Sequence, residues 1–142
     1  AIDDETPESV VVGLSREFDY EACDRASRHV RSGARFVATN RDPTLPVPGA
    51  LRPGAGAIVA AIATAAGTEP EVAGKPSATM ARVIEARVAV GAVVGDRATT
   101  DGALARRLGA PFALVASDAG DGDGDATVRA SSLLEAVRAL LG

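Results

Sequence analysis

The feature that most constrains this chain is the alternation of short apolar runs with longer segments of helical spacing. Residues 10–14 form a β-branched run of strand length, residues 19–32 carry apolar and small side chains at helical intervals, and residues 35–38 form a second apolar run. Strand, helix and strand in this order are typical of a parallel βαβ unit, because parallel strands need a crossover between them. The same pattern predicts that Asp19 caps the helix and that Gly33 ends it.

The alternation continues along the rest of the chain. Short apolar runs predict further strands near 72–73, 91–94, 112–116 and Val128. Small-residue runs and helical spacing predict further helices over 54–66, over 77–88, from Thr99 or Thr100 to 108, and from Ser131 to Leu141. The predicted fold class is therefore α/β, with a mainly parallel sheet in a three-layer arrangement.

Residues 39–53 interrupt this pattern. The segment holds four prolines, which remove backbone donors and restrict their neighbours, so we predict an irregular loop. A loop of this length is more often functional than a simple connection.

Charge and composition exclude several classes of protein. The 15 Lys and Arg residues oppose 19 Asp and Glu, a net charge of −4 that leaves no basic surface for nucleic acid. No apolar run reaches the roughly 18 residues of a membrane span. A single cysteine, Cys23, excludes an internal disulfide and is typical of a reducing compartment. We therefore expect a cytoplasmic protein of 142 residues, in one domain or two small ones, that binds neither nucleic acid nor membrane.

The single lysine of the chain is the first candidate for chemistry. All other basic residues except His29 are Arg, whereas Lys75 stands alone between Gly74 and Pro76. Ligands of open parallel sheets bind at the carboxyl ends of strands, and the segments that follow predicted strands are 39–42, 74–76 and 95–97. We expect the strands at 72–73 and 91–94 to be neighbours, so that Lys75 and Asp96 open onto one crevice.

Two carboxylates accompany this lysine. Asp96 follows the strand at 91–94, and Asp101 falls in the first turn of the next predicted helix. Carboxylates across a turn suit Mg²⁺, which keeps several waters and needs few protein ligands. A lysine beside Mg²⁺ is arranged to bind a phosphate dianion. Taken singly, each residue also has a simpler explanation, as a solvated Lys, a turn-stabilising Asp or an acid at a helix start.

Together these segments resemble the haloacid dehalogenase-like (HAD-like) phosphatases. Gly74-Lys75-Pro76 and the stretch 93–101 are similar to the third and fourth motifs of that superfamily. The segments at 10–14, 33–44 and 53–56 are similar to the cap and returning segment of the nitrophenylphosphatase and phosphoglycolate phosphatase branch. The resemblance covers residues 9–116, and more loosely the chain to residue 142.

The resemblance implies a role for each candidate residue. Asp96 would be a Mg²⁺ ligand, Asp101 would support the metal site, and Lys75 would hold the phosphate and the nucleophile in register. The cap loop that faces a phosphorylated small-molecule substrate would contain Asn40, Asp42 and Thr44. Residues 1–70 would be part of an α/β cap domain, and residues 71–142 the C-terminal half of a HAD-like core domain.

One departure from the family concerns the mechanism. The family's nucleophile is an Asp in an Asp-x-Asp-Gly motif near the N-terminus, and the only such motif here lies at 121–124 and follows no apolar strand. We therefore expect that the chain begins inside the cap, and that a longer protein or a separate chain supplies the missing half. Without the nucleophile, this chain alone should hydrolyse phosphomonoesters negligibly.

Other interpretations stay open at this point. The chain could be a non-catalytic phosphatase-like module that binds a phosphorylated ligand or a protein partner, or a structural fragment. A half-sheet also leaves an apolar face and a strand edge uncovered, which predicts self-association or a covering chain.

Three minor features have structural explanations. We expect the acidic segment 118–125 to be a solvated loop, because it lacks the Gly and Glu positions of a calcium loop. Gly54 and Gly56 fit a helix start better than a dinucleotide site. Gly102 stands where the family usually carries an aliphatic residue.

Overall fold

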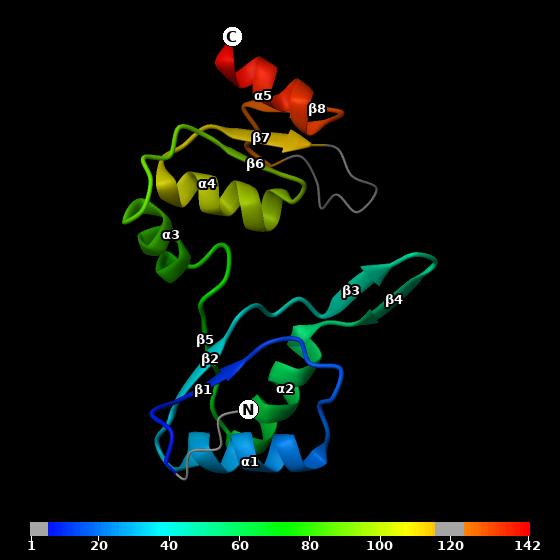
Figure 1. Cartoon of the computed structure of the whole chain (residues 1–142), viewed down its shortest axis with the longest axis vertical. Helices are drawn as coiled ribbons and strands as arrows, with labels where there is room; N and C mark the ends of the chain where they lie inside the picture. The colour runs from blue at the N-terminus through cyan, green and yellow to red at the C-terminus, as the bar shows by residue number, and fades with distance from the viewer. Residues whose placement is uncertain (1–5, 116–123) are drawn as a thin grey trace. The chain divides into compact units, whose positions relative to one another are not determined.

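A computed structural model describes residues 6–115 and 124–142 of the chain (Figure 1). The chain divides into two compact units, Ala1–Gly74 and Lys75–Gly142, which we call unit 1 and unit 2. Among the described residues, no helix is long and apolar enough to cross a membrane. Residues 118–123 of the acidic segment lie outside the described residues, and Asp125 forms an ion pair with Arg106 at 3.1 Å.

Unit 1 contains the predicted parallel βαβ arrangement. Its elements, in chain order, are β1 (Ser9–Val12), α1 (Tyr20–Arg31), β2 (Arg35–Ala38), β3 (Thr44–Val47), β4 (Ala50–Pro53), α2 (Ala55–Ala66) and β5 (Glu71–Val72). The strands β1, β2 and β5 form a parallel sheet with β2 in the centre. Asp19 caps α1 as expected, since its Oδ1 accepts the Ala22 N–H at 2.8 Å. The helix ends before Gly33, which adopts a left-handed backbone conformation (φ 103°).

The core of unit 1 lies on one face of this sheet. Helices α1 and α2 pack against each other there, as Figure 1 shows. Val12 and Phe36 point from the strands into the core, where they meet Val59 and Ile62 of α2. Val11, whose side chain alternates to the opposite face, is 65% exposed. Unit 1 is therefore a sheet with its helices on a single face.

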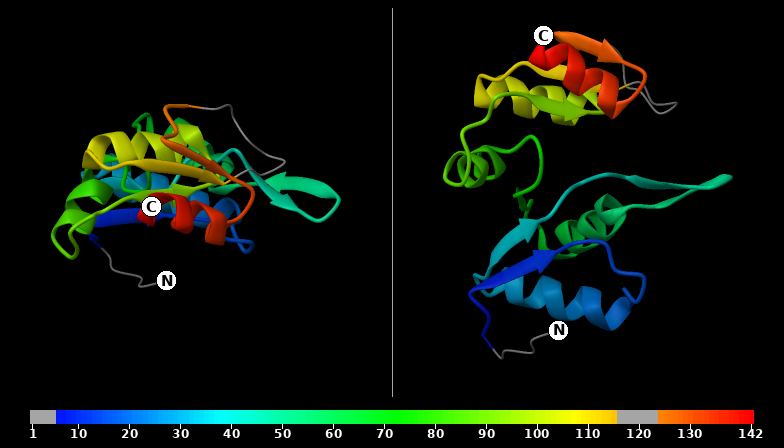
Figure 2. Two further views of the ribbon diagram at one scale, coloured as in Figure 1. Left: turned by 90° about the horizontal axis from the view of Figure 1, so that it is seen from above. Right: turned by 45° about the horizontal axis from the view of Figure 1, so that its top comes forward.

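The expectation of an irregular loop over 39–53 was wrong. The segment contains an antiparallel hairpin, β3–β4, in which Val47 pairs with Ala50 (Figure 2). Gly49 supplies the left-handed turn residue (φ 74°). A two-stranded ribbon is all edge, so its prolines can occupy positions whose backbone N–H would not pair across the ladder. The prolines exclude a strand in the centre of a sheet, but they are compatible with the strands of a two-stranded hairpin.

Unit 2 is a second parallel sheet with helices on both faces. Its elements are α3 (Ala78–Glu85), β6 (Val93–Gly95), a π-helical turn η1 (Ala98–Gly102), α4 (Ala103–Leu108), β7 (Phe112–Val115), β8 (Val128–Ala130) and α5 (Leu133–Leu141). The strand order is β6-β7-β8. Phe112 packs with Ala105 of α4, and the next residue, Ala113, packs with Ala136 of α5. Successive residues of β7 point to opposite faces, so α4 and α5 cover different sides of the sheet. This confirms the three-layer α/β prediction.

Several boundaries in unit 2 differ from prediction. The helix expected over 77–88 spans Ala78–Glu85, after Ser77 as its N-cap. Thr99 and Thr100 cap no helix, because both lie inside η1. The cap of α5 is Ser132, not Ser131, since Ser132 Oγ accepts the Glu135 N–H at 3.3 Å.

The predicted pairing of the strands that precede Lys75 and Asp96 was also wrong. Strand β5 pairs with β2 in the sheet of unit 1, whereas β6 pairs with β7 in unit 2. Strands that follow each other in the chain are adjacent in only about two-thirds of cases. Here the chain passes from one sheet to another between them.

Candidate functional site

Two of the predicted site residues meet in unit 2. The Lys75 ammonium donates to Asp101 Oδ1 at 2.7 Å. The Asp101 side chain is 6% exposed, whereas that of Lys75 is 52% exposed. A buried carboxylate needs compensating partners, and Asp101 has two, because its Oδ2 also accepts the Arg97 N–H at 3.2 Å. The buried acid therefore holds one side of a lysine whose other side faces solvent.

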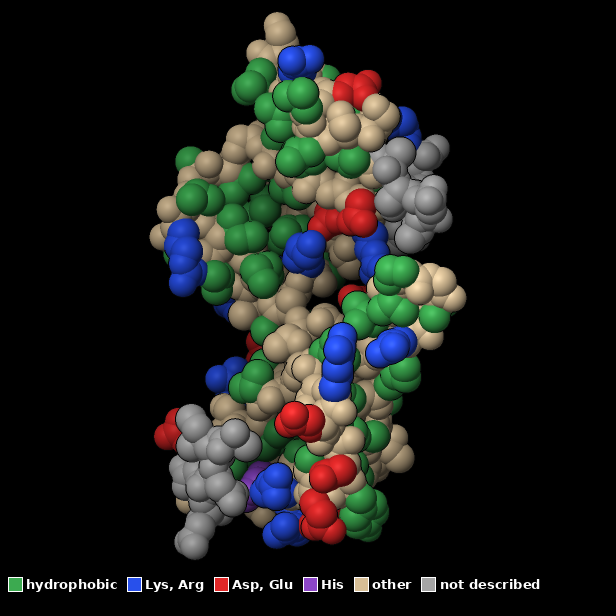
Figure 3. Space-filling model, turned by 45° about the vertical axis from the view of Figure 1, so that its right-hand side comes forward, with side chains coloured by type: hydrophobic (Ala, Val, Ile, Leu, Met, Phe, Trp, Pro, Cys, Tyr) green, Lys and Arg blue, Asp and Glu red, His purple; other side chains and the backbone are tan. Residues whose placement is uncertain are grey.

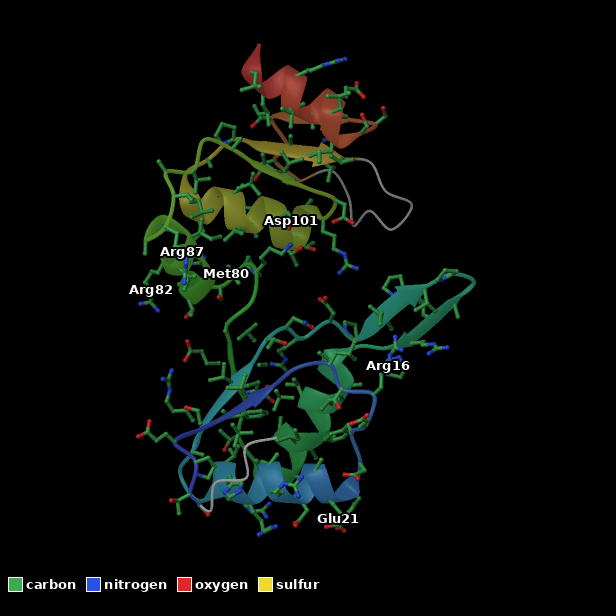
Figure 4. All side chains as sticks on the ribbon, in the orientation of Figure 1. Arg16, Glu21, Met80, Arg82, Arg87 and Asp101 are labelled. Carbon is green, nitrogen blue, oxygen red and sulfur yellow. The ribbon has the colours of Figure 1, made fainter. Side chains whose placement is uncertain are left out.

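The local backbone places Asp101 inside this site (Figure 4). It lies in η1, where the Asp101 and Gly102 N–H groups both donate to Arg97 O, at 2.8 and 3.3 Å. Wide turns of this π-helical kind occur frequently at functional sites. The turn brings the carboxylate back under the end of β6.

Gly95, the last residue of β6, makes this arrangement possible. A Cβ at this position would lie 2.3 Å from both Cγ and Oδ2 of Asp101, so any side chain would displace the carboxylate. The sequence interpretation included Gly95 in the motif but gave it no role. The signal that identifies it is a glycine at a strand end, directly before a candidate ligand.

Gly102 has a comparable explanation. It is buried, and a Cβ there would lie 3.1 Å from Cε1 of Phe112. The larger aliphatic side chain that is usual in the family at this position would therefore crowd the ring of Phe112. Glycine at position 102 leaves space for the phenylalanine at position 112.

The third predicted residue of this site, Asp96, has a different environment. It follows β6 directly and is exposed. Its carboxylate is a hard oxygen donor, which suits Mg²⁺, whereas Asp101 is already engaged by Lys75. Among the described residues, no three His, Cys, Asp or Glu side chains form a metal-binding group. An ion at Asp96 would therefore depend on water and ligand oxygens for most of its coordination.

The remaining predicted residues, in unit 1, form the segment that leads into the β3–β4 hairpin. Asn40 Oδ1 accepts the Asp42 N–H at 3.1 Å, which is a turn-stabilising contact. Asp42 is half-buried, and Thr44 is exposed at the start of β3. The structure thus places the three side chains along one short stretch, and their contact with a substrate stays a prediction.

The glycines at the start of α2 have a packing role. A Cβ on Gly54 would lie 2.2 Å from Asp42 O, and one on Gly56 would lie 2.4 Å from Arg41 O. The Gly56 N–H donates to Asp42 O at 2.9 Å. Close backbone contact, rather than nucleotide binding, explains both glycines.

Known proteins match both the sequence and the motifs of this site. The HAD-hydrolase-like family model matches residues 72–139, which include Lys75, Asp96 and Asp101. The D-glycerol 3-phosphate phosphatase of Mycobacterium tuberculosis is 41% identical over 114 residues, which are 79% of this chain and 32% of that protein. The chain belongs to the HAD-like superfamily. The resemblance stated from the sequence is thereby confirmed.

Solved HAD-like phosphatase structures show the same fold. The p-nitrophenyl phosphatase from Archaeoglobus fulgidus has a TM-score of 0.80 at 30% identity, over 93% of this chain and 56% of that one. A glycerol phosphate phosphatase from Mycobacterium tuberculosis, in complex with magnesium, has a TM-score of 0.70 at 43% identity, over 77% of this chain and 34% of that one. The chain thus spans between 32% and 56% of the lengths of these relatives.

Proposed function

We propose that this chain supplies the phosphate-holding and magnesium-holding part of a HAD-like phosphatase that acts on small phosphomonoesters. The observation that carries the proposal is the ion pair of Lys75 with the buried Asp101 at 2.7 Å. Asp101 contacts the Lys75 ammonium on one side, and the rest of the ammonium is exposed to solvent. The exposed side can therefore bind an anion such as a phosphate. The small-molecule phosphatases among the relatives support the same reaction class.

Each side chain then has a separate task. Lys75 binds a phosphate oxygen and stabilises the negative charge that is redistributed during transfer. Asp101 orients that ammonium and keeps it in place, with Gly95 leaving the space that the carboxylate occupies. Asp96 holds Mg²⁺ with water, and the ion when bound adds positive charge next to the phosphate.

For unit 1 we propose the role of a cap. In this assignment, residues 1–70 belong to an α/β cap and residues 71–142 to half of the core. Asn40, Asp42 and Thr44 would offer amide, carboxylate and hydroxyl groups to the polar part of the substrate. These groups match a small hydroxylated phosphate such as the glycerol 3-phosphate named for one relative.

The chemical step needs a nucleophile that we do not assign to this chain. Lys75 and Asp96 position and stabilise, but neither attacks phosphorus, whereas the family reaction passes through a carboxylate nucleophile. We propose that a further polypeptide segment, in a longer protein or a separate chain, provides it.

Two measurements test the proposal. The purified chain should show no turnover of p-nitrophenyl phosphate above background, and Mg²⁺-dependent turnover that Asp96→Asn removes would contradict the missing nucleophile. In calorimetric titrations, Mg²⁺ binding should weaken about tenfold or more in Asp96→Asn. The matched variant Asp24→Asn removes an exposed carboxylate of α1 and should leave Mg²⁺ binding unchanged. Equal Mg²⁺ affinity in both variants would refute the metal assignment.

A further inference from the structure

Unit 1 contains a cavity that the proposed function does not use. Its volume is about 390 Å³, which lies in the range of small-molecule sites. The segment after β1, the β3–β4 hairpin and the start of α2 form its walls, with the lining residues Leu14, Ser15, Arg16, Phe18, Leu45, Arg52, Pro53, Gly54 and Ile58. All of these residues belong to unit 1.

Two arginines are the charged residues among the described lining of this cavity. Arg16 comes from the segment after β1, beside the hairpin in Figure 4, and Arg52 comes from β4. Neither arginine forms an ion pair or a side-chain hydrogen bond with a residue that the structure describes.

Other arginines of unit 1 differ in this respect. Three of them pair with an acid at 3.0 Å or less, in the pairs Arg28–Asp24, Arg35–Glu71 and Arg41–Glu69. Among the residues that the structure describes, no Asp or Glu lines the cavity. Two guanidinium groups without a counter-charge therefore share one concave site, and the planar fork of arginine matches oxyanions.

The rest of the lining is mainly apolar. Leu14, Phe18 and Leu45 offer surface to an apolar group, and Leu14 is 47% exposed. Such a wall beside two cations suits a ligand with an anionic end and an apolar end. The N-cap of α2, Gly54, also lines the cavity, and the first turn of α2 contains no acid that would oppose an anion.

We propose that this cavity binds a small organic oxyanion, with its charged group between Arg16 and Arg52 and its apolar group against Leu14, Phe18 and Leu45. The site goes beyond the proposed phosphatase function, because it uses neither Lys75 nor the acids of unit 2. Phosphonates and carboxylates share the chemistry that the site recognises, so the test includes one of each.

The probe for the test is phenylphosphonate, which cannot be hydrolysed, titrated into the ¹⁵N-labelled 142-residue chain. We expect amide shifts at Leu45, Gly54 and Ile58, which line the cavity. Benzoate should shift the same amides, and its affinity relative to phenylphosphonate ranks the two anion classes. Benzyl alcohol, which is neutral, should bind about tenfold or more weakly than either.

Variants separate this site from a general attraction of anions. Arg16→Gln and Arg52→Gln should each raise the Kd for phenylphosphonate about tenfold. Arg25→Gln removes the same charge from an exposed position on α1 outside the cavity, and it should leave the Kd unchanged. Arg52→Lys keeps the positive charge but loses the planar guanidinium group, so its Kd for phenylphosphonate should lie between those of the parent chain and Arg52→Gln.

The outcome also distinguishes this proposal from the phosphatase proposal. Lys75→Met should abolish any shifts around residues 95–101 but leave those of the cavity in place. An absence of cavity shifts in the parent chain, or an equal loss of affinity in Arg25→Gln, overturns the cavity proposal and leaves the role of Lys75 untouched.

Discussion

The two units of this chain bury different kinds of side chain. The core of unit 1 is built on branched and aromatic residues such as Phe36, Val59 and Ile62. That of unit 2 is built largely on alanine, at positions such as Ala113 and Ala136, with larger side chains at Phe112 and Leu104. Burial of an alanine removes much less apolar surface from water than burial of a valine or phenylalanine. Unit 1 is therefore the better stabilised of the two by its own core.

Both units expose some large apolar residues, and in unit 2 several of them lie on its last helix. On α5, Leu133, Leu134 and Leu141 are 63%, 60% and 83% exposed. Hydrophobic side chains also reach the surface in the space-filling view (Figure 3). The helix places Ala136 against the sheet with Leu140 packed beside it, and leaves its other leucines exposed. The covering chain or self-association expected from the sequence stays a prediction, and α5 is where we expect the contact.

The largest expected effect tests whether the two cores are independent. Phe36→Ala and Phe112→Ala each remove a buried ring, at a cost of about 3–5 kcal/mol. Because each ring belongs to the core cluster of its own unit, Phe36→Ala should lower hydrogen-exchange protection in unit 1, and Phe112→Ala in unit 2. Loss of protection in both units from either variant would show that the two cores unfold together.

A smaller loss of stability is expected when the packing around Asp101 in unit 2 is disturbed. Gly95→Ala places a Cβ 2.3 Å from the Asp101 carboxylate, and we expect it to destabilise unit 2 by about 1–3 kcal/mol in urea unfolding. Gly91→Ala is the matched control, since a Cβ there meets nothing within 4 Å. Equal stability of the two variants would mean that Asp101 can leave its place without cost, and would remove the basis for the Lys75 site.

The elements that local pattern determines were predictable from the sequence. Hydrophobic periodicity and helix capping act within a few residues. They predicted the βαβ unit, the Asp19 cap and the α/β fold class. The ion pair of Lys75 with Asp101 was not predicted: strand ends and the family motif grouped the two residues in one site, but their contact depends on a wide turn that no local pattern signals.

Features that depend on long-range pairing were not predictable. In the hairpin over 44–53, Pro46 lies opposite Leu51 and Pro53 lies opposite Thr44. Each strand of the hairpin has an open edge, where the missing N–H of a proline does not cost a ladder hydrogen bond. Strand β5 likewise pairs with β2, which lies more than 30 residues earlier in the chain, so its place in the sheet depends on a long-range contact. The cavity between Arg16 and Arg52 requires the hairpin, so it could not be found while that segment was expected to be irregular.

The smallest expected effect lies on the exposed helix that distinguishes unit 2. Ser131 donates to Glu135 Oε2 through its backbone N–H at 2.8 Å and through its hydroxyl at 2.6 Å. These bonds favour the carboxylate and lower the pKa of Glu135 below its ordinary value of 4.5. A lowered pKa means that the stabilisation is present above pH 4.5 and is lost as the pH falls through the lower value of the folded chain.

Glu135→Gln should therefore flatten the pH dependence of hydrogen-exchange protection in α5, once intrinsic exchange rates are corrected. At neutral pH the parent helix should be slightly better protected than the variant, and the difference should vanish in acid. The effect is small because Glu135 is exposed, where solvent screens its contacts. Glu85→Gln, at an exposed position at the end of α3, is the control and should keep the parent profile of α5. If Glu135→Gln also keeps that profile, the Ser131 bonds do not hold the start of α5, and the ordering of this exposed helix must come from the Ser132 cap and from its contact with the sheet.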